Sequence, residues 1–146
     1  MTDVSLTFCL RLARAHAALT RRLDGRLSSL HGLSFSDFMV LYYLHHAEGG
    51  RLRRTDLAEQ LGLTASGVTR TLLPLEKIGL VTRQPDPRDA RVGYATLSPS
   101  GNRLFTDALS TVGETCQDAT RAMPARQLTG LSEALAQLSP PPFLHN

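Results

Sequence analysis

Apolar residues recur at helical spacing along the first thirty residues. One set follows the period of a single helix face and consists of Leu12, Leu19, Leu23, Leu27 and Leu30. A second set on the same segment has similar spacing and consists of Leu6, Leu10, Ala13 and Ala17. We therefore expect one helix over residues 3–30, ended by His31 and Gly32. One apolar face would pack on its own domain and the other on a second body.

The last third of the chain shows the same period. Ser98 followed by Pro99 is typical of the start of a helix. The apolar positions that follow are Phe105, Leu109, Val112, Cys116 and Ala119. After an interruption at Met123 and Pro124, a last amphipathic helix is predicted from Leu128, Leu131, Leu135 and Leu138, and the prolines at 140–142 end it. We expect the first and last helices to pack together and against a second copy of the chain.

Shorter elements are predicted between these helices. Ser34 and Asp37 stand at the spacing of a capping box and begin a helix to about residue 45, which the glycines at 49 and 50 break. Residues 51–53 form a candidate strand, and residues 55–61 and 64–78 are two helices separated by Gly62. Residues 80–84 and 92–97 are two strands separated by a turn.

The spacing within residues 54–78 indicates a helix-turn-helix. Ala58, Gly62 and Val68 stand at relative positions 0, +4 and +10, where this motif needs small or branched residues. Leu63, Val68 and Leu72 are expected to face inward. The residues on the other faces, which can approach bases and phosphates, are Thr64, Ala65, Ser66, Thr69 and Arg70. The alternative for this helix alone is a capped amphipathic helix with a solvated polar face.

A basic, turn-rich tip joins the two predicted strands. Arg88 and Arg91 are suited to probing a minor groove or the phosphate backbone. Asp86 and Asp89 would repel phosphate, so we expect them to hold the tip arginines by ion pairs or to cap the turn. A solvated charged hairpin is the alternative for the tip taken alone.

These elements predict a mainly α (α+β) fold, a winged helix-turn-helix with flanking N- and C-terminal dimerisation helices. We expect a single domain over residues 1–146. The winged module would occupy residues 34–98, and the dimerisation helices would occupy residues 1–31 and 99–140.

Composition narrows the function classes. The net charge of +3 is mildly basic, and Lys77 is the only lysine among 16 basic residues. Arginine suits phosphate and guanine, although a GC-rich coding bias would produce the same skew. No apolar run reaches the roughly 20 residues that cross a bilayer, and no signal peptide is visible, so a cytoplasmic protein is expected. Two cysteines without metal-ligand spacing predict neither zinc nor a disulfide scaffold. No catalytic motif or cofactor loop is present, so we expect no enzyme and no cofactor.

Four motifs resemble the multiple antibiotic resistance regulator (MarR) family. The first reads Leu75-Glu76-Lys77-x-Gly79-Leu80-Val81-x-Arg83, and the second is the tip, Asp86-Pro87-Arg88-Asp89-Ala90-Arg91. The others are Leu97-Ser98-x-x-Gly101 and Gly32-Leu33-Ser34-x-x-Asp37-Phe38-x-Val40-Leu41. In the tip, Asp89 and Arg91 match the family pattern. Ala90 replaces its usual middle basic residue, with Arg88 nearby as a candidate substitute.

The resemblance implies a homodimeric regulator of transcription, usually a repressor, that binds double-stranded DNA. Such proteins are often released by a small phenolic or anionic effector or by oxidation. We expect the DNA-binding residues to be Arg53, Thr64, Ala65, Ser66, Thr69, Arg70, Arg83, Arg88 and Arg91. Asp89 is expected to stabilise the wing. The alternative is a winged-helix module for protein interaction or assembly without specific DNA binding.

No effector site is identified by the sequence. His16, the pair Tyr42 and Tyr43, and the pair His45 and His46 could line a pocket. Adjacent helical residues point about 100° apart, so neither pair forms one ligand face, and core or surface roles are favoured. Cys9 lacks the tyrosines that activate a reactive cysteine in some family members, so we expect it to be structural. Cys116, on an apolar stripe, is expected in the core or at an interface.

Overall fold

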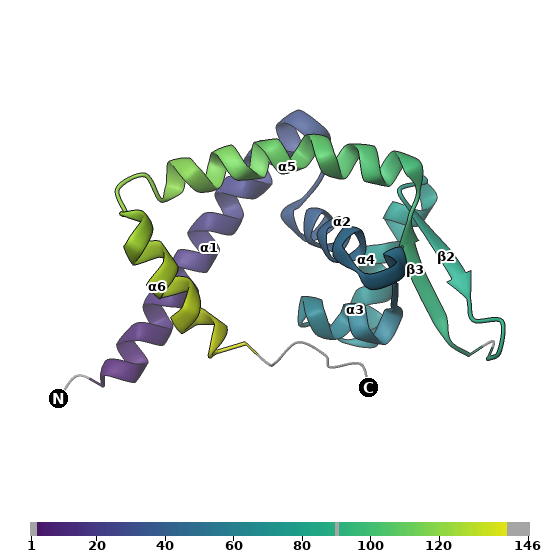
Figure 1. Ribbon diagram of the computed structural model, residues 1–146, viewed down its shortest axis with the longest axis horizontal. Coiled ribbons are helices and arrows are strands. Elements are labelled where there is room, and N and C mark those ends of the chain that lie inside the picture. Colours follow the sequence, from purple (N-terminus) through teal and green to yellow (C-terminus); the bar gives the residue numbers. More distant parts are fainter. Residues whose placement is uncertain (1–2, 90, 140–146) are drawn as a thin grey trace. The chain divides into compact units, whose positions relative to one another are not determined.

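A computed structural model of the protein describes residues 3–89 and 91–139 (Figure 1). The chain divides into two compact units, Met1–Thr115 and Cys116–Asn146, each described here by itself. Ala90 in the tip motif and the predicted proline stop at residues 140–142 lie outside the described residues. Within the described ranges, no helix combines the length and apolar character needed to cross a membrane.

The predicted order of elements is confirmed, with one short 3₁₀ turn added. The elements of the first unit are α1 (Val4–His31), α2 (Phe35–His46), η1 (Glu48–Gly50), β1 (Arg51–Arg53), α3 (Arg54–Leu61), α4 (Ala65–Lys77), β2 (Val81–Pro85), β3 (Gly93–Leu97) and most of α5 (Pro99–Ala119). The second unit contains the end of α5 and α6 (Ala125–Ala136). Mostly helical structure with a small sheet is the predicted winged helix-turn-helix fold.

Local capping sets the connection between α1 and α2. Gly32 ends α1 in the left-handed conformation, with φ of 67°, which glycine adopts at little cost. The Ser34 hydroxyl then accepts from the Asp37 N–H at 3.0 Å, and the Asp37 carboxylate accepts from the Ser34 N–H at 3.0 Å. The predicted capping box is therefore present and begins α2.

The sheet is antiparallel, with strand order β1-β3-β2. Ala95 on the central strand lies opposite Leu52 on one side and Arg83 on the other, and it is fully buried. β2 and β3 form a hairpin whose tip projects beyond α3 and α4 (Figure 1). The small sheet therefore attaches the tip to the helical core.

The core of the first unit surrounds α2. Fully buried side chains from four helices meet there, including Leu41, Leu57, Leu72 and Phe105. The rings of Phe38 and Phe105 stack with centroids 5.5 Å apart. This packing fixes α3, α4 and the start of α5 as one body.

Only part of the predicted apolar face of α1 is buried. Leu23 and Leu27 are in the interior, whereas Leu19 and Leu30 are exposed. The second apolar set is exposed as well, with Leu6 56% and Leu10 61% accessible. Within the described residues of the first unit, nothing covers these leucines.

The buried face of α5 also differs from the prediction. Phe105 is buried as predicted, but Leu109 is exposed, and the other buried residues are Gly101, Ala108, Thr111 and Thr115. The threonines tolerate burial because their hydroxyls are bonded: Thr115 donates to the Thr111 carbonyl at 2.8 Å, and the Thr111 hydroxyl lies 2.7 Å from His31 Nε2. In the second unit, no residue of α6 is buried; Leu131 and Leu135 on α6, and Leu138 just after it, are exposed.

Gly101 allows α5 to approach the backbone of Leu80, immediately before β2, closely. A methyl group at Gly101 would lie 2.1 Å from the Leu80 carbonyl oxygen, which also accepts from the Ser98 N–H at 3.0 Å.

We expect Gly101→Ala to lower the free energy of unfolding by about 2–3 kcal/mol through overpacking. At Gly113, also in α5, nothing lies within 4 Å. Gly113→Ala should therefore raise the free energy of unfolding by about 0.5–1 kcal/mol. Chemical denaturation followed by circular dichroism measures both, and equal stabilities of the two variants would contradict the close contact.

Candidate nucleic-acid interface

The turn between α3 and α4 has the predicted helix-turn-helix geometry. Gly62 ends α3 with φ of 67°, and the Leu63 N–H donates to the Ala58 carbonyl at 2.8 Å. The Thr64 hydroxyl accepts from the Gly67 N–H at 3.1 Å and caps α4. Ala58 and Val68 are buried where the two helices meet.

The predicted inward position of Leu63 is wrong. Its side chain is 40% exposed because Leu63 belongs to the turn that precedes the Thr64 cap and lies outside the helix. Helical periodicity therefore does not apply to it. The residues that α4 buries are Val68, Leu72 and Leu75.

The opposite face of α4 carries the predicted reading residues. All five, namely Thr64, Ala65, Ser66, Thr69 and Arg70, are exposed. The Thr64 and Ser66 hydroxyls lie 3.2 Å apart at the helix start. Within the described ranges Arg70 forms no ion pair, so its donor fork is available to an acceptor outside the chain.

Asp86 organises the turn of the wing. Its carboxylate accepts from the N–H groups of Arg88 at 2.7 Å and Asp89 at 3.3 Å, and from the Tyr94 hydroxyl at 3.3 Å. The Arg88 N–H is the largest cause of a lowered pKa of Asp86. The wing aspartates were expected either to pair with the tip arginines or to cap the turn. Asp86 therefore caps the turn.

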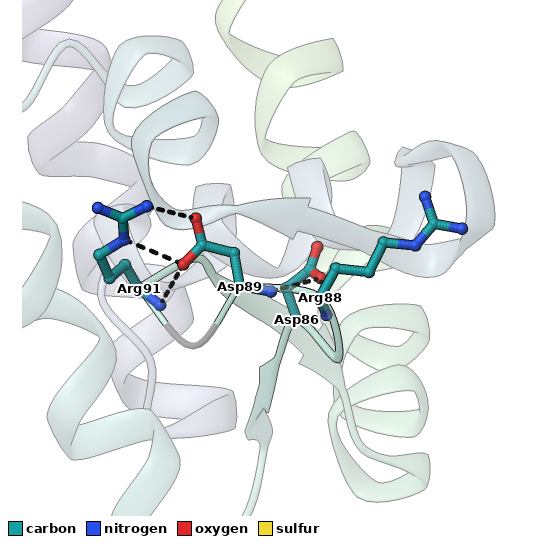
Figure 2. A network of polar contacts seen from close by, with 4 residues as sticks. All are labelled: Asp86, Arg88, Asp89 and Arg91. Carbon is teal, nitrogen blue, oxygen red and sulfur yellow. Dashed lines mark hydrogen bonds and ion pairs between the residues drawn. The ribbon is translucent and has the colours of Figure 1, made fainter.

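Asp89 forms the expected ion pair with Arg91. Its two oxygens accept from Arg91 Nε at 3.1 Å and Nη2 at 3.2 Å, and the Arg91 N–H also donates to it at 3.0 Å. These bonds, chiefly that of the Arg91 side chain, lower the pKa of Asp89. The Arg91 side chain remains 91% exposed, so the pair orients Arg91 and adds little to stability. Figure 2 shows the Arg88 side chain extending away from this pair, so Arg88 and Arg91 reach different places.

Four arginines converge where the wing meets α3. They border a cleft of about 240 Å³ that is lined by Arg53, Arg54, Thr55, Arg83, Arg91, Val92 and Gly93. Arg54 pairs with Glu76, and Arg91 pairs with Asp89. Arg53 and Arg83 form no ion pair within the part of the chain that the structure describes. The cleft therefore carries an excess of positive charge, as a phosphate site requires.

Sequence reasoning missed Arg54 in this cluster. Its position directly before the helix-turn-helix, next to Arg53, was the available signal. Arg51, two residues before Arg53, has a different role because its guanidinium lies 4.2 Å from the centre of the Tyr94 ring.

A second cavity, of about 300 Å³, lies among α1, α2 and the helix-turn-helix. Its lining comprises His16, Thr20, Phe35, Ser36, Met39, Tyr43, Gln60, Leu61, Leu63 and Thr71. Burial, followed by the neighbouring Tyr42, raises the pKa of Tyr43. Among the candidate effector residues, the cavity brings together His16 and Tyr43 only. His45 instead contacts Asn102 at 3.2 Å, and its ring packs at a tilt against Phe105 with centroids 4.5 Å apart.

The two cysteines differ in exposure. Cys9 is exposed and Cys116 is half-buried, and both are unpaired. No group of metal-ligating side chains is found among the described residues. Cys9 therefore does not contribute to the core of this chain.

Comparisons with known proteins support the same fold. The MarR family model matches residues 31–92. The HTH-type transcriptional regulator MhqR of Bacillus subtilis (strain 168) is 28% identical over 107 residues, covering 73% of this chain and 72% of that protein.

Solved structures resemble the described chain over nearly its whole length. One is Sco3205, a MarR family transcriptional regulator from Streptomyces coelicolor in complex with DNA, with a TM-score of 0.84 and 24% identity, covering 94% of this chain and 88% of that one. A MarR family transcriptional regulator from Rhodococcus sp. RHA1 has a TM-score of 0.87 and 23% identity, and the match covers 99% of this chain and 100% of that one. At this identity the likeness shows the fold.

The wing turn should be sensitive to acid. The ionised Asp86 carboxylate stabilises the wing turn. Because the pKa of Asp86 is lowered, this stabilisation is complete above the ordinary pKa of 3.8 and is lost as pH falls through the lowered pKa. In an NMR titration, the Arg88 amide signal should shift with a midpoint below 3.8. Asp86→Asn should abolish that transition. A midpoint at or above the ordinary value would contradict the hydrogen-bonded turn.

Proposed function

We infer that this chain is a member of the MarR family, and on that premise we propose that it is a transcriptional regulator that binds double-stranded DNA sequence-specifically. The start of α4 enters the major groove, and the wing contacts the adjacent minor groove or the backbone. One observation carries the proposal. The exposed polar face of α4 adjoins the arginine-lined cleft, since Arg54 borders the cleft and donates to Thr69 at 3.1 Å.

Two kinds of contact bind the DNA: contacts to base edges, and contacts to phosphates or the minor groove. Base edges are approached by the residues at the start of α4, namely Ser66, Thr69 and Arg70, with Thr64 and Ala65 beside them. Arg53, Arg83, Arg88 and Arg91 bind phosphates or the minor groove, and Asp89 keeps Arg91 oriented. No step requires a metal, a cofactor or catalysis.

The regulator acts as a homodimer. Exposed leucines on α1 in the first unit, and others on α6 in the second, supply apolar surface that supports burial against a second copy. A two-fold dimer binds a pseudo-palindromic site with half-sites ~10 bp or a multiple of that apart. Bound at a promoter in the cytoplasm, it acts as a repressor by occupying the DNA.

A small-molecule effector would bind in the cavity lined by His16 and Tyr43. The cavity volume of about 300 Å³ lies at the lower end of ligand pockets. Leu61 and Leu63 place the end of α3 and the turn to α4 in its lining. A ligand that fits only one arrangement of that turn would change the population of the DNA-binding state.

Arg70 and Arg91 should have separable effects on DNA binding. Arg70→Ala should reduce the preference for the target over random duplex about tenfold, because a base contact is lost. Arg91→Ala should weaken binding to every duplex and reduce the salt slope of log K by about 1, because a phosphate contact is lost. Arg121→Ala removes the same charge from the second unit, where Arg121 pairs with Asp118, and should change neither quantity. Fluorescence anisotropy across a salt series distinguishes these results. Unchanged binding in both the Arg70 and Arg91 variants would reject the assigned roles, and binding indifferent to sequence in the unsubstituted protein would favour the protein-interaction module.

Charge on the exposed face of α1 should abolish the dimer. The double variant Leu6→Glu and Leu10→Glu should sediment as a monomer and lose most operator affinity, because it places carboxylates in an apolar interface. Ile78→Glu is the matched control, since Ile78 is 67% exposed at the end of α4 and lies outside the proposed interface. Analytical ultracentrifugation measures the outcome. A dimeric double variant would contradict the assignment of this face.

A further inference from the structure

Arg54 uses both ends of its guanidinium fork within the protein. Nη1 donates to Glu76 Oε1 at 3.2 Å, and Nη2 donates to Thr69 Oγ1 at 3.1 Å. The Arg54 side chain is 18% exposed and that of Glu76 is 23% exposed. Unlike the exposed Arg53 beside it, Arg54 is already paired and is poorly placed to receive a phosphate.

The Arg54 side chain also touches the wing. A methyl group at Gly93 on β3 would lie 3.2 Å from Arg54 Cδ and 3.7 Å from Arg83 Nε. The absence of a side chain at Gly93 therefore leaves room for the stem of Arg54. From the start of α3, this one residue spans the base of the wing and the exposed face of α4.

The Thr69 hydroxyl is fixed by two bonds. It donates its only hydrogen to the Ala65 carbonyl at 3.1 Å and accepts from Arg54. A threonine held in this way cannot donate to a base. What it can offer a major groove is its methyl group and one remaining acceptor lone pair.

We propose that Arg54 is a positioning residue that locks Thr69 as a methyl-presenting, non-donating reader and thereby sets base preference at one position of each half-site. The base that fits this chemistry is thymine, through its 5-methyl group. The Arg54–Glu76 pair holds the fork in place, so the planar geometry of arginine matters beyond its charge. This inference rests on the proposed DNA-binding function.

The substitution Arg54→Lys separates geometry from charge. Lysine keeps the positive charge beside Glu76 but lacks the fork that reaches Glu76 and Thr69 together. Arg121→Lys is the matched control, because Arg121 also pairs with a carboxylate, that of Asp118, but lies in the second unit outside the proposed DNA-binding residues. Thr69→Val keeps a branched side chain of similar shape but cannot accept from Arg54, and the double variant Arg54→Lys with Thr69→Val completes a cycle.

The experiment first selects the preferred site of the unsubstituted full-length protein from a random duplex library. Affinities of all variants are then measured for that site, for every single-base change in a half-site, and for random duplex, together with thermal unfolding. Arg54→Lys should lower the preference at one position about five- to tenfold, the range of a modest base contact. Its affinity for random duplex and its unfolding temperature should stay close to those of the Arg121→Lys control.

The double-mutant cycle tests whether Arg54 acts through Thr69. Thr69→Val should alter preference at the same position as Arg54→Lys, and in the Thr69→Val background Arg54→Lys should have no further effect there. Unchanged base preference in Arg54→Lys, a uniform loss on all duplexes, or additive effects in the double variant would each overturn the inference alone. Absence of any preferred site for the unsubstituted protein would overturn the proposed function as well.

Discussion

Helix α4 buries one face, and that constraint decides which of its side chains can meet DNA. Val68, Leu72 and Leu75 are held in the core, where α4 packs on α2, α3 and β2. With a rotation of about 100° per residue, the opposite face at Ser66, Thr69 and Arg70 must then point to solvent. The left-handed turn at Gly62 and the cap at Thr64 fix where this face begins. Rotation of α4 would therefore disrupt the core before it changed the reading face.

Acidic residues give the basic surface its geometry. Glu76 holds Arg54, Asp89 holds Arg91, and Asp86 binds the backbone of the wing turn. Each acid lies beside an arginine or a backbone N–H and so orients donors as well as reducing net charge. The Asp89–Arg91 pair lies at the surface, where ion pairs add little to stability, so its effect is mainly on direction. The Arg54–Glu76 pair is more buried, with side chains 18% and 23% exposed. Arg53 and Arg83 form no ion pair within the described residues and supply charge to the same cleft.

Local chemistry made much of this structure predictable. The turn at Gly62, the Ser34 capping box and the Asp89–Arg91 pair each depend on residues within a few positions of one another. Contacts between distant elements were not predictable in this way. The burial of Thr111 depends on His31, the fork of Arg54 depends on α4 and β3, and the cavity at His16 and Tyr43 depends on the packing of α1 on α2. Leu63 was misplaced because a helical period was applied to a residue of the turn.

Sequence-specific DNA binding is the claim on which the roles of α4 and the wing depend. Footprinting of the DNA that flanks the gene for this chain, across a series of salt concentrations, tests it most directly. We predict protection of a pseudo-palindromic site that persists at physiological salt, with protected half-sites ~10 bp or a multiple of that apart. Protection that is absent, or that spreads evenly along the DNA and disappears as salt approaches the physiological range, would contradict it.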